Sequence, residues 1–282
     1  MMAATESTSN RLEDSTDPIR ILFWNAHKHD LCEEISLLAK ELLVDIVVLL
    51  EYGGDPKSYL LWLQQRADSR FAIPDHISSR FLVLSRIPSP DFEEVYPSSR
   101  FSIRRFRHQN QFALLALFHG YDPINYNIDN RSRLAREMSR DLREVMKLHQ
   151  TNKALIVGDF NLNPYDSVMN DVTGLNAMMT KSCVAKGARK FDGRAYDYFY
   201  NPMWSFLGDL SPGAPGSIYY KGYQGDYGWN MFDQVLLHHS LTSSLLDVQI
   251  IHRQDGIPLA NKRGHPNAKL SDHFPLLVAL RR

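Results

Sequence analysis

The sequence has 282 residues, of which 44% are hydrophobic and 23% charged, and its 32 basic residues balance its 32 acidic ones. These values are typical of a globular protein with one large domain or two modest ones, and they give no sign of bulk nucleic-acid binding, although a local cleft can still be positive. The two cysteines form no disulfide or metal-binding pattern. Residues 1–17 lack the apolar core of a secretion signal, and no stretch has the length of a transmembrane helix. We therefore expect a cytoplasmic protein with a disordered tail over residues 1–18.

Apolar runs and helical spacings predict five strands and three helices in the first part of the chain. The strands are expected at residues 19–24, 46–50, 81–84, 101–107 and 111–118, and the helices at 31–43, 56–67 and 130–149. The last helix has an apolar stripe at helical spacing. Its many charged residues are best explained as a solvated outer face.

The second part of the chain is less regular. A buried strand is predicted over residues 154–157, a helix-and-loop region continues to about residue 198, and residues 199–230, rich in Gly, Pro and aromatic residues, are expected to form an ordered loop. Further strands are expected at 232–237, 248–252 and 274–280. No internal repeat or low-complexity linker interrupts the pattern. We predict one α+β domain over residues 19–282, with two packed sheets and helices outside them.

Polar residues at the ends of these strands carry the chemical information. The strand 154–157 runs into Gly158-Asp159-Phe160-Asn161, which places a carboxylate and a carboxamide two residues apart, on the same side of an extended segment. Asp233 lies inside a predicted strand, where an unpaired carboxylate is costly to bury. Other apolar runs end or begin beside further polar residues, namely Asn25, Glu51, His119, Asp272 and His273.

Each of these residues alone has an ordinary explanation as a turn former, a surface group or a structural histidine. Their joint occurrence is not explained in this way, because strand ends from distant parts of a chain can meet at one edge of a sheet. There Glu51 and Asp272 would hold a hard divalent cation such as Mg²⁺ through oxygen. His119 and His273 would serve as proton carriers or phosphate clamps.

This series of motifs resembles the endonuclease/exonuclease/phosphatase superfamily. The motifs that carry the resemblance are Trp24-Asn25, Leu49-Leu50-Glu51, Phe118-His119, Gly158-Asp159-Phe160-Asn161, Phe232-Asp233-Gln234-Val235 and Ser271-Asp272-His273. They span residues 19–280. The resemblance implies a four-layer α/β/β/α sandwich, with the site at one edge of the two sheets.

The resemblance also implies the groups that hold the metal and the phosphate. Glu51 would be the principal ligand of Mg²⁺, or of Mn²⁺, and Asp272 a second carboxylate at or near the metal. Asn25 and Asn161 would hold phosphate oxygens, and His273 would contact the same phosphate.

The catalytic groups follow from the same resemblance. Asp159 would position or deprotonate the attacking water, with Asn161 beside it. His273, oriented by Asp233, would bind and neutralise the phosphoryl group, and His119 would lie near the leaving oxygen. Phosphodiester hydrolysis needs charge neutralisation of this kind, and a neighbouring carboxylate keeps an imidazole protonated.

Some positions depart from the pattern of the superfamily. His27 stands where several members carry an acidic group, which leaves the number of metal ions open. Leu50 replaces a glutamine that often precedes the glutamate, and Gly120 stands where leucine is common. Val157 and Gln234 replace the Trp and Arg that are typical of the inositol phosphatase branch.

Nucleic acid is therefore the first choice of substrate, with DNA favoured over RNA. Candidate contacts are two basic segments and one aromatic residue that can stack on a base, namely Arg105, Arg107, Lys262, Arg263 and Trp229. Ordinary edge-strand charges and aromatic packing under a loop remain alternatives for these residues.

The expected function is thus a Mg²⁺-dependent phosphodiesterase, specifically a nuclease that hydrolyses DNA through metal-assisted attack of water. One alternative is a phosphomonoesterase, or a phosphodiesterase of small molecules or lipids, from the same superfamily. An alternative of another class is a catalytically silent binding module that has kept the fold.

Overall fold

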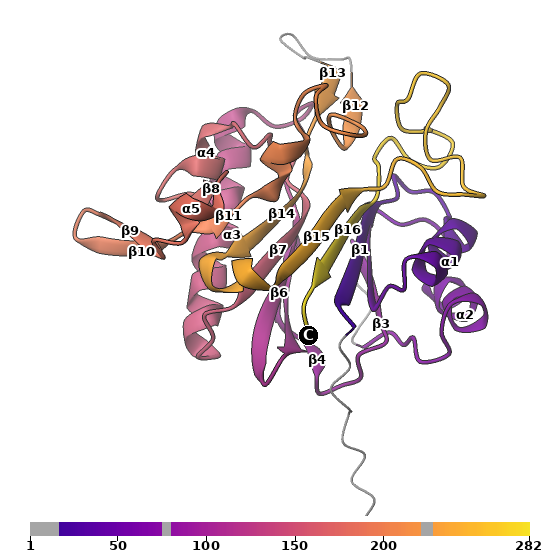
Figure 1. The fold of residues 1–282 in the computed structure, drawn as a ribbon, viewed down its shortest axis with the longest axis horizontal. Coiled ribbons are helices and arrows are strands. Elements are labelled where there is room, and N and C mark those ends of the chain that lie inside the picture. Colours follow the sequence, from indigo (N-terminus) through magenta and orange to yellow (C-terminus); the bar gives the residue numbers. More distant parts are fainter. Residues whose placement is uncertain (1–16, 75–79, 221–227) are drawn as a thin grey trace, which may run out of the picture.

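The computed structural model describes residues 17–74, 80–220 and 228–282. The tail predicted over residues 1–18 therefore lies almost entirely outside the described residues. Two sheets pack face to face, and helices cover their outer faces (Figure 1). This arrangement confirms the predicted α+β architecture of two packed mixed sheets between outer helices.

The first sheet has five strands in the order β15-β16-β1-β2-β3. Their bounds are β1 (Ile19–Asn25), β2 (Ile46–Leu50), β3 (Phe81–Ser85), β15 (Leu245–Ile250) and β16 (Leu276–Leu280). The helices α1 (Cys32–Glu41) and α2 (Pro56–Arg66) lie on its outer face (Figure 1). Strand β2 is buried along its whole length, and burial on both faces of a strand explains a continuous rather than alternating apolar run.

The second sheet has seven strands in the order β4-β5-β6-β7-β14-β11-β8. Their bounds are β4 (Phe92–Pro97), β5 (Phe101–His108), β6 (Gln111–His119), β7 (Ala154–Asp159), β8 (Ala177–Met178), β11 (Phe199–Tyr200) and β14 (Asp233–His238). Helix α3 (Ile128–Leu148) covers its outer face. The helix begins at Asn127, whose side chain accepts a hydrogen bond from the Asn130 N–H.

Several short elements were not predicted. The edge strand β4 contains Glu93 and Glu94, so its sequence lacks the apolar run that marks the inner strands. The expected helix-and-loop region holds α4 (Ser167–Asn170), α5 (Lys181–Val184) and a hairpin of β9 (Ala188–Phe191) and β10 (Arg194–Asp197). The expected loop 199–230, of which 221–227 lie outside the described residues, contains β11, the 3₁₀ helix η1 (Pro202–Phe206), β12 (Ile218–Tyr220) and β13 (Gly228–Asn230).

One glycine allows the two central parallel strands of the larger sheet to approach closely. A Cβ atom on Gly158 would lie 1.9 Å from the Phe118 carbonyl oxygen, so any side chain there would push β7 away from β6. In the part of the chain that the structure describes, none of the helices combines the length and apolar character needed to span a bilayer.

Candidate active site

The strand register brings the predicted polar residues to one edge of each sheet. In the smaller sheet β1 and β2 run parallel and pair Asn25 with Leu50, so Glu51 follows at the same edge. Strand β16 runs antiparallel to β1, which places the preceding His273 there too. In the larger sheet the parallel pair β6–β7 aligns His119 with Asp159, and the antiparallel β14 aligns Asp233 with Asp159.

Hydrogen bonds join the two edges. The Asn25 side-chain N–H donates to Asp159 Oδ2 at 3.1 Å, which links the smaller sheet to the larger one. Within the smaller sheet, the Trp24 indole N–H donates to the His273 carbonyl oxygen at 2.9 Å, and the Ser271 hydroxyl donates to the Asn25 carbonyl oxygen at 2.6 Å. Sequences far apart in the chain therefore meet in one buried polar cluster.

At the centre of this cluster His273 lies between two carboxylates. His273 Nδ1 is 2.6 Å from Asp233 Oδ2, and one ligand atom each of Asp159, Asp233 and His273 lies within 4.8 Å of the others. Burial alone would lower the pKa of His273, but the Asp233 carboxylate, aided by Asp159 and Asp272, raises that pKa to about 10. The Asp233 carboxylate therefore favours a positive charge on His273.

Asp159 is a buried carboxylate with directed hydrogen bonds. Its Oδ1 accepts from the Asn161 backbone N–H at 2.9 Å, and its Oδ2 accepts from Asn25. Burial, and secondarily the charge of Asp233, raise the pKa of Asp159 to about 6 despite the nearby His273 cation. Asp159 is thus mainly ionised at neutral pH but more basic than an ordinary aspartate, which suits a proton acceptor.

Two of the predicted residues have a left-handed backbone conformation. Glu51 follows β2 with a φ of +47°, and Asn161 follows β7 with a φ of +50°. Non-glycine residues adopt such conformations infrequently, and they do so disproportionately at functional sites. Arg131 of α3 donates a hydrogen bond to the Asn161 carbonyl oxygen, which helps to hold the second turn.

Arg80 is a member of the site that sequence reasoning missed. Its Nη1 lies 2.7 Å from His119 Nδ1, and His119 Nε2 lies 3.2 Å from Glu51 Oε1. Because a guanidinium can only donate, Nδ1 must accept, and the proton of a neutral His119 is on Nε2, toward Glu51. The hydrogen bond from His119 lowers the pKa of Glu51 to about 2, so this carboxylate is ionised. No sequence pattern around Arg80 indicated this contact.

The carboxylates on the smaller sheet fit a hard divalent cation. Asp272 Oδ1 is shielded from solvent and accepts no hydrogen bond from the described residues. Its neighbours are His27 Nδ1 at 3.2 Å and His273 Nε2 at 3.7 Å. Such an oxygen, together with the ionised Glu51, is the donor type that Mg²⁺ prefers. His27, at the position noted as a departure, contacts this carboxylate directly.

The five candidate nucleic-acid residues separate into two groups. In the β5–β6 pairing Arg105 lies opposite Leu114 and Arg107 opposite Phe112, at the end of β6 that is farthest from His119. Arg105 forms an ion pair with Glu93 of β4, and Arg107 forms one with Asp91, which directly precedes β4. The structure therefore does not bring these two arginines to the site, because the antiparallel register directs them away from it.

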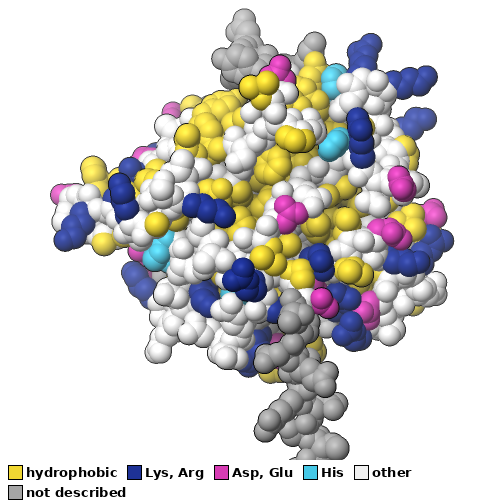
Figure 2. Space-filling model, viewed as in Figure 1, with side chains coloured by type: hydrophobic (Ala, Val, Ile, Leu, Met, Phe, Trp, Pro, Cys, Tyr) yellow, Lys and Arg dark blue, Asp and Glu magenta, His cyan; other side chains and the backbone are white. Residues whose placement is uncertain are grey.

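The other three candidates lie near the site edge. Trp229 belongs to β13, and its ring centroid is 6.4 Å from that of Phe274, the residue after His273. Lys262 and Arg263 are exposed in the loop that joins β15 to β16. Figure 2 shows Lys and Arg side chains projecting at the upper right, over this loop.

Comparisons with known proteins agree with this architecture. A sequence profile described as "Endonuclease/Exonuclease/phosphatase family" matches residues 20–273. No curated protein sequence matches the chain significantly.

Several solved structures share the fold at low sequence identity. Truncated TDP2 from Caenorhabditis elegans has a TM-score of 0.56 at 14% identity, covering 94% of this chain and 98% of that one. TDP2 from D. rerio, complexed with a single-strand DNA product, has a TM-score of 0.56 at 15% identity, covering 94% and 99%. The human Nocturnin catalytic domain with a bound sulfate anion has a TM-score of 0.52 at 12% identity, covering 94% and 95%. With the profile match over most of its length, the chain belongs to the endonuclease/exonuclease/phosphatase family, whose members are hydrolases acting on phosphodiester bonds.

Proposed function

We propose that the protein is a Mg²⁺-dependent nuclease that hydrolyses phosphodiester bonds of DNA in preference to RNA. The observation that carries the proposal is the His273 imidazolium, held by the buried Asp233 beside the basic carboxylate of Asp159. A fixed cation next to a proton acceptor suits a reaction in which water attacks a phosphate anion.

In this proposal Asp159, His273 and Asn25 act on the water and the phosphate. Asp159 accepts the proton of the attacking water, since its raised pKa favours proton transfer at neutral pH. His273 neutralises the non-bridging phosphate oxygens. Asn25 Oδ1 accepts from the His27 N–H at 3.1 Å, which turns the amide nitrogen toward Asp159 and leaves its second hydrogen for a phosphate oxygen.

Two further residues complete the assignment. Asn161 holds a second phosphate oxygen from its left-handed turn. His119, whose neutral tautomer Arg80 fixes, contacts the leaving-group side of the phosphate. Fixed donors of this kind stabilise the transition state because they need no reorganisation during the reaction.

Glu51 and Asp272 would hold the metal, with Mg²⁺ favoured and Mn²⁺ acceptable because both are bound by carboxylate oxygens. When bound, the cation supplies positive charge that stabilises the departing alkoxide. The ionised state of Glu51 supports this assignment, as does Asp272 Oδ1, which lies 3.2 Å from His27 Nδ1 but accepts no hydrogen bond from the described residues.

The choice of nucleic acid as substrate is supported by the aromatic and basic residues near the edge of the sheets that carries the candidate active site. Trp229 is half-buried against Phe274 and would stack on a base only through the exposed part of its ring, and Lys262 and Arg263 offer positive charge in the neighbouring loop. The D. rerio TDP2 structure, which has the same fold, was solved with a single-strand DNA product. Arg105 and Arg107 are not part of the proposed surface. The cytoplasmic location stays a prediction.

Incubation with single- and double-stranded DNA and RNA, with and without a chelator, tests the proposal. We expect cleavage of DNA that stops on chelation and in Glu51→Gln. Failure to cleave any of the four polymers, alongside turnover of nucleotides or phosphoinositides, would identify a phosphomonoesterase or small-molecule phosphodiesterase instead. A chain that turns over none of these compounds and binds no Mg²⁺ through Glu51 would be a silent binding module.

A further inference from the structure

A second cluster of ligating side chains lies at the far end of β14 from the candidate active site. His238 is the last residue of β14 and His239 the first residue of the 3₁₀ helix η2 (His239–Ser244). Asp197, the last residue of β10, faces them. Five residue steps separate His238 from Asp233, which corresponds to about 16 Å along a strand. The cluster is therefore separate from the proposed catalytic groups.

The spacing of the three side chains matches that of metal ligands. One ligand atom from each residue lies within 4.8 Å of the others, and His238 Nε2 is 3.3 Å from Asp197 Oδ2. Neighbouring ligands of tetrahedral Zn²⁺, with bonds of about 2.0–2.2 Å, lie about 3.3–3.6 Å apart. The His238–Asp197 pair already has this separation. The imidazole rings of His238 and His239 lie side by side, with centroids 4.3 Å apart.

Neighbouring groups orient His238 as a ligand. Its side chain is 1% exposed, and its Nδ1 lies 2.9 Å from the Ser240 hydroxyl oxygen. That hydroxyl donates its single hydrogen to the Asn152 carbonyl oxygen. The Ser240 backbone N–H donates to His238 Nδ1 at 3.4 Å and so caps η2. Nε2 is the ring nitrogen that faces Asp197, and its contact with Asp197 Oδ2 lowers the pKa of that carboxyl. The contacts at Nδ1 fix the orientation of the ring, as neighbouring groups do for metal-bound histidines.

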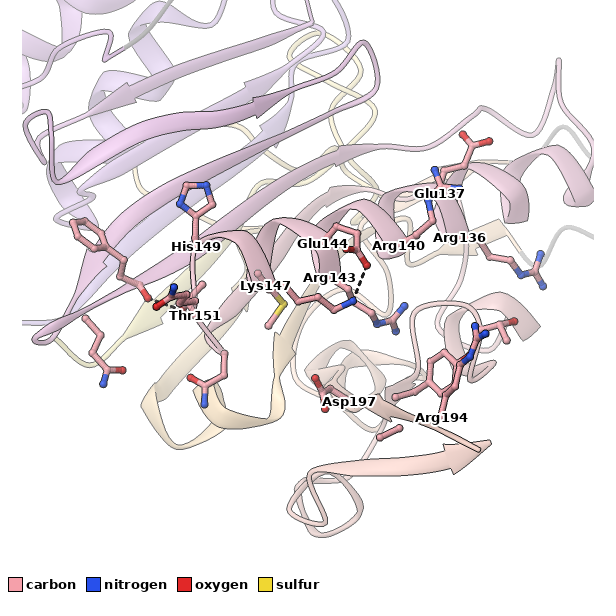
Figure 3. Close-up of a pocket in the computed structure, with 18 of the residues that line it drawn as sticks. Arg136, Glu137, Arg140, Arg143, Glu144, Lys147, His149, Thr151, Arg194 and Asp197 are labelled. Atoms are coloured by element: carbon pink, nitrogen blue, oxygen red, sulfur yellow. Dashed lines mark hydrogen bonds and ion pairs between the residues drawn. The ribbon is translucent and has the colours of Figure 1, made fainter. Parts of the chain in front are cut away.

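The surroundings favour a neutral second imidazole and leave an open side. Burial is the main cause that lowers the pKa of His239, although Asp197 opposes it, and only neutral imidazole binds a metal. Asp197 is half-exposed and lies in the wall of a groove between the hairpin β9–β10 and helix α3 (Figure 3). Because Asp197 and His239 are both partly exposed, water can reach the cluster. Arg194 lies on the hairpin side, and Arg136, Arg140 and Arg143 lie on the α3 side.

We propose that Asp197, His238 and His239 form a Zn²⁺ site that fastens the hairpin β9–β10 to the end of the seven-stranded sheet. Two imidazole nitrogens and one carboxylate are the donor set of Zn²⁺ rather than of Mg²⁺. The metal would fix the position of the hairpin and with it the shape of the arginine-lined groove. The competing explanation is an ion pair between His238 and Asp197 that binds no metal.

Calorimetric titration of the full chain with Zn²⁺ tests the proposal. The variants are Asp197→Asn and His239→Gln, because both side chains are partly exposed and their loss should leave the metal-free fold intact. Asp192→Asn, at the exposed tip of the same hairpin, is the matched control. All variants are measured in the Glu51→Gln background, so that binding at the candidate active site does not enter the count.

We expect one Zn²⁺ per chain in the background and in the control, and none in Asp197→Asn or His239→Gln. Co²⁺ should give the visible absorption of a tetrahedral nitrogen and oxygen site, lost in the same two variants. Zn²⁺ should also protect the hairpin from limited proteolysis in the background and in the control, but not in Asp197→Asn or His239→Gln. Unchanged Zn²⁺ stoichiometry in both variants, or no Zn²⁺ binding by the background chain, would overturn the proposal. Neither result depends on nuclease activity.

Discussion

Replacement of Asp233 by asparagine should reduce the charge of His273 while keeping the shape of the site. The Asp233 side chain is fully buried and lies 2.6 Å from His273 Nδ1. In the wild type this carboxylate holds the pKa of His273 at about 10, against burial, which lowers it. In Asp233→Asn only Asp159 and Asp272 still offset burial, and we expect the pKa of His273 to fall. A larger share of the imidazole is then uncharged at neutral pH.

The expected fall in the kcat of Asp233→Asn follows from the loss of the His273 charge. Removal of one preorganised group that stabilises a transition state typically lowers kcat about 10²–10³-fold, or about 2.7–4 kcal/mol. The wild type should be active between the pKa of Asp159, about 6, and that of His273, about 10. In Asp233→Asn the alkaline limb should move to lower pH. Steady-state rates on a DNA oligonucleotide from pH 5 to 10 measure both effects.

The pH dependence of the free energy of unfolding tests the charge of His273 independently of turnover. The folded pKa of His273 exceeds its ordinary value of 6.5, so its contribution to stability is complete below pH 6.5 and is lost as the pH rises toward 10. The slope should be about 1.4 kcal/mol per pH unit in the wild type and smaller in Asp233→Asn. Asp247→Asn, on the exposed face of β15, is the control. Wild-type kcat with an unmoved alkaline limb would refute the reasoning.

Three further results are expected. Asp159→Asn should abolish turnover without changing the circular dichroism spectrum or lowering Tm, and near-normal rates would remove Asp159 from the mechanism. Glu51→Gln should lose Mg²⁺ binding in calorimetry, whereas the exposed Glu144→Gln should retain it; equal affinities would exclude Glu51 as the ligand. Gly158→Ala should lower the free energy of unfolding by about 1–3 kcal/mol, since its Cβ would overlap the Phe118 carbonyl oxygen; an unchanged urea midpoint would show that the strands can separate without cost.

The inner strands and the strand-end residues were predictable because burial leaves a direct pattern in the sequence. Strand β2 is five consecutive buried apolar residues, and Glu51 follows it at once. Asp159 likewise ends β7, and Asn161 comes two residues later. The outer strands left a weaker pattern: β4 alternates poorly because its glutamates pair with arginines of β5 rather than with a core.

Contacts between elements could not be predicted from local patterns. Arg80 precedes β3, and only the packing of the two sheets brings it to His119. Arg105 and Arg107 had a basic sequence suited to nucleic acid, but register decides which end of a strand faces the site, and it turns them toward β4. The His238–Asp197 contact likewise depends on the hairpin β9–β10, which the sequence did not indicate.

The neighbouring positions of β1 and β16 bear on how the protein matures during translation. The Trp24–His273 hydrogen bond joins residues 249 positions apart, and β16 lies between β15 and β1. At synthesis rates of about 5–20 residues per second, the ribosome needs about 12–50 s between these two residues. Throughout that interval β1 can pair with β2 but not with β16, and a nascent chain holds Asp159 without His273. Under the proposed function, the growing polypeptide lacks its complete set of catalytic groups until His273 has been added.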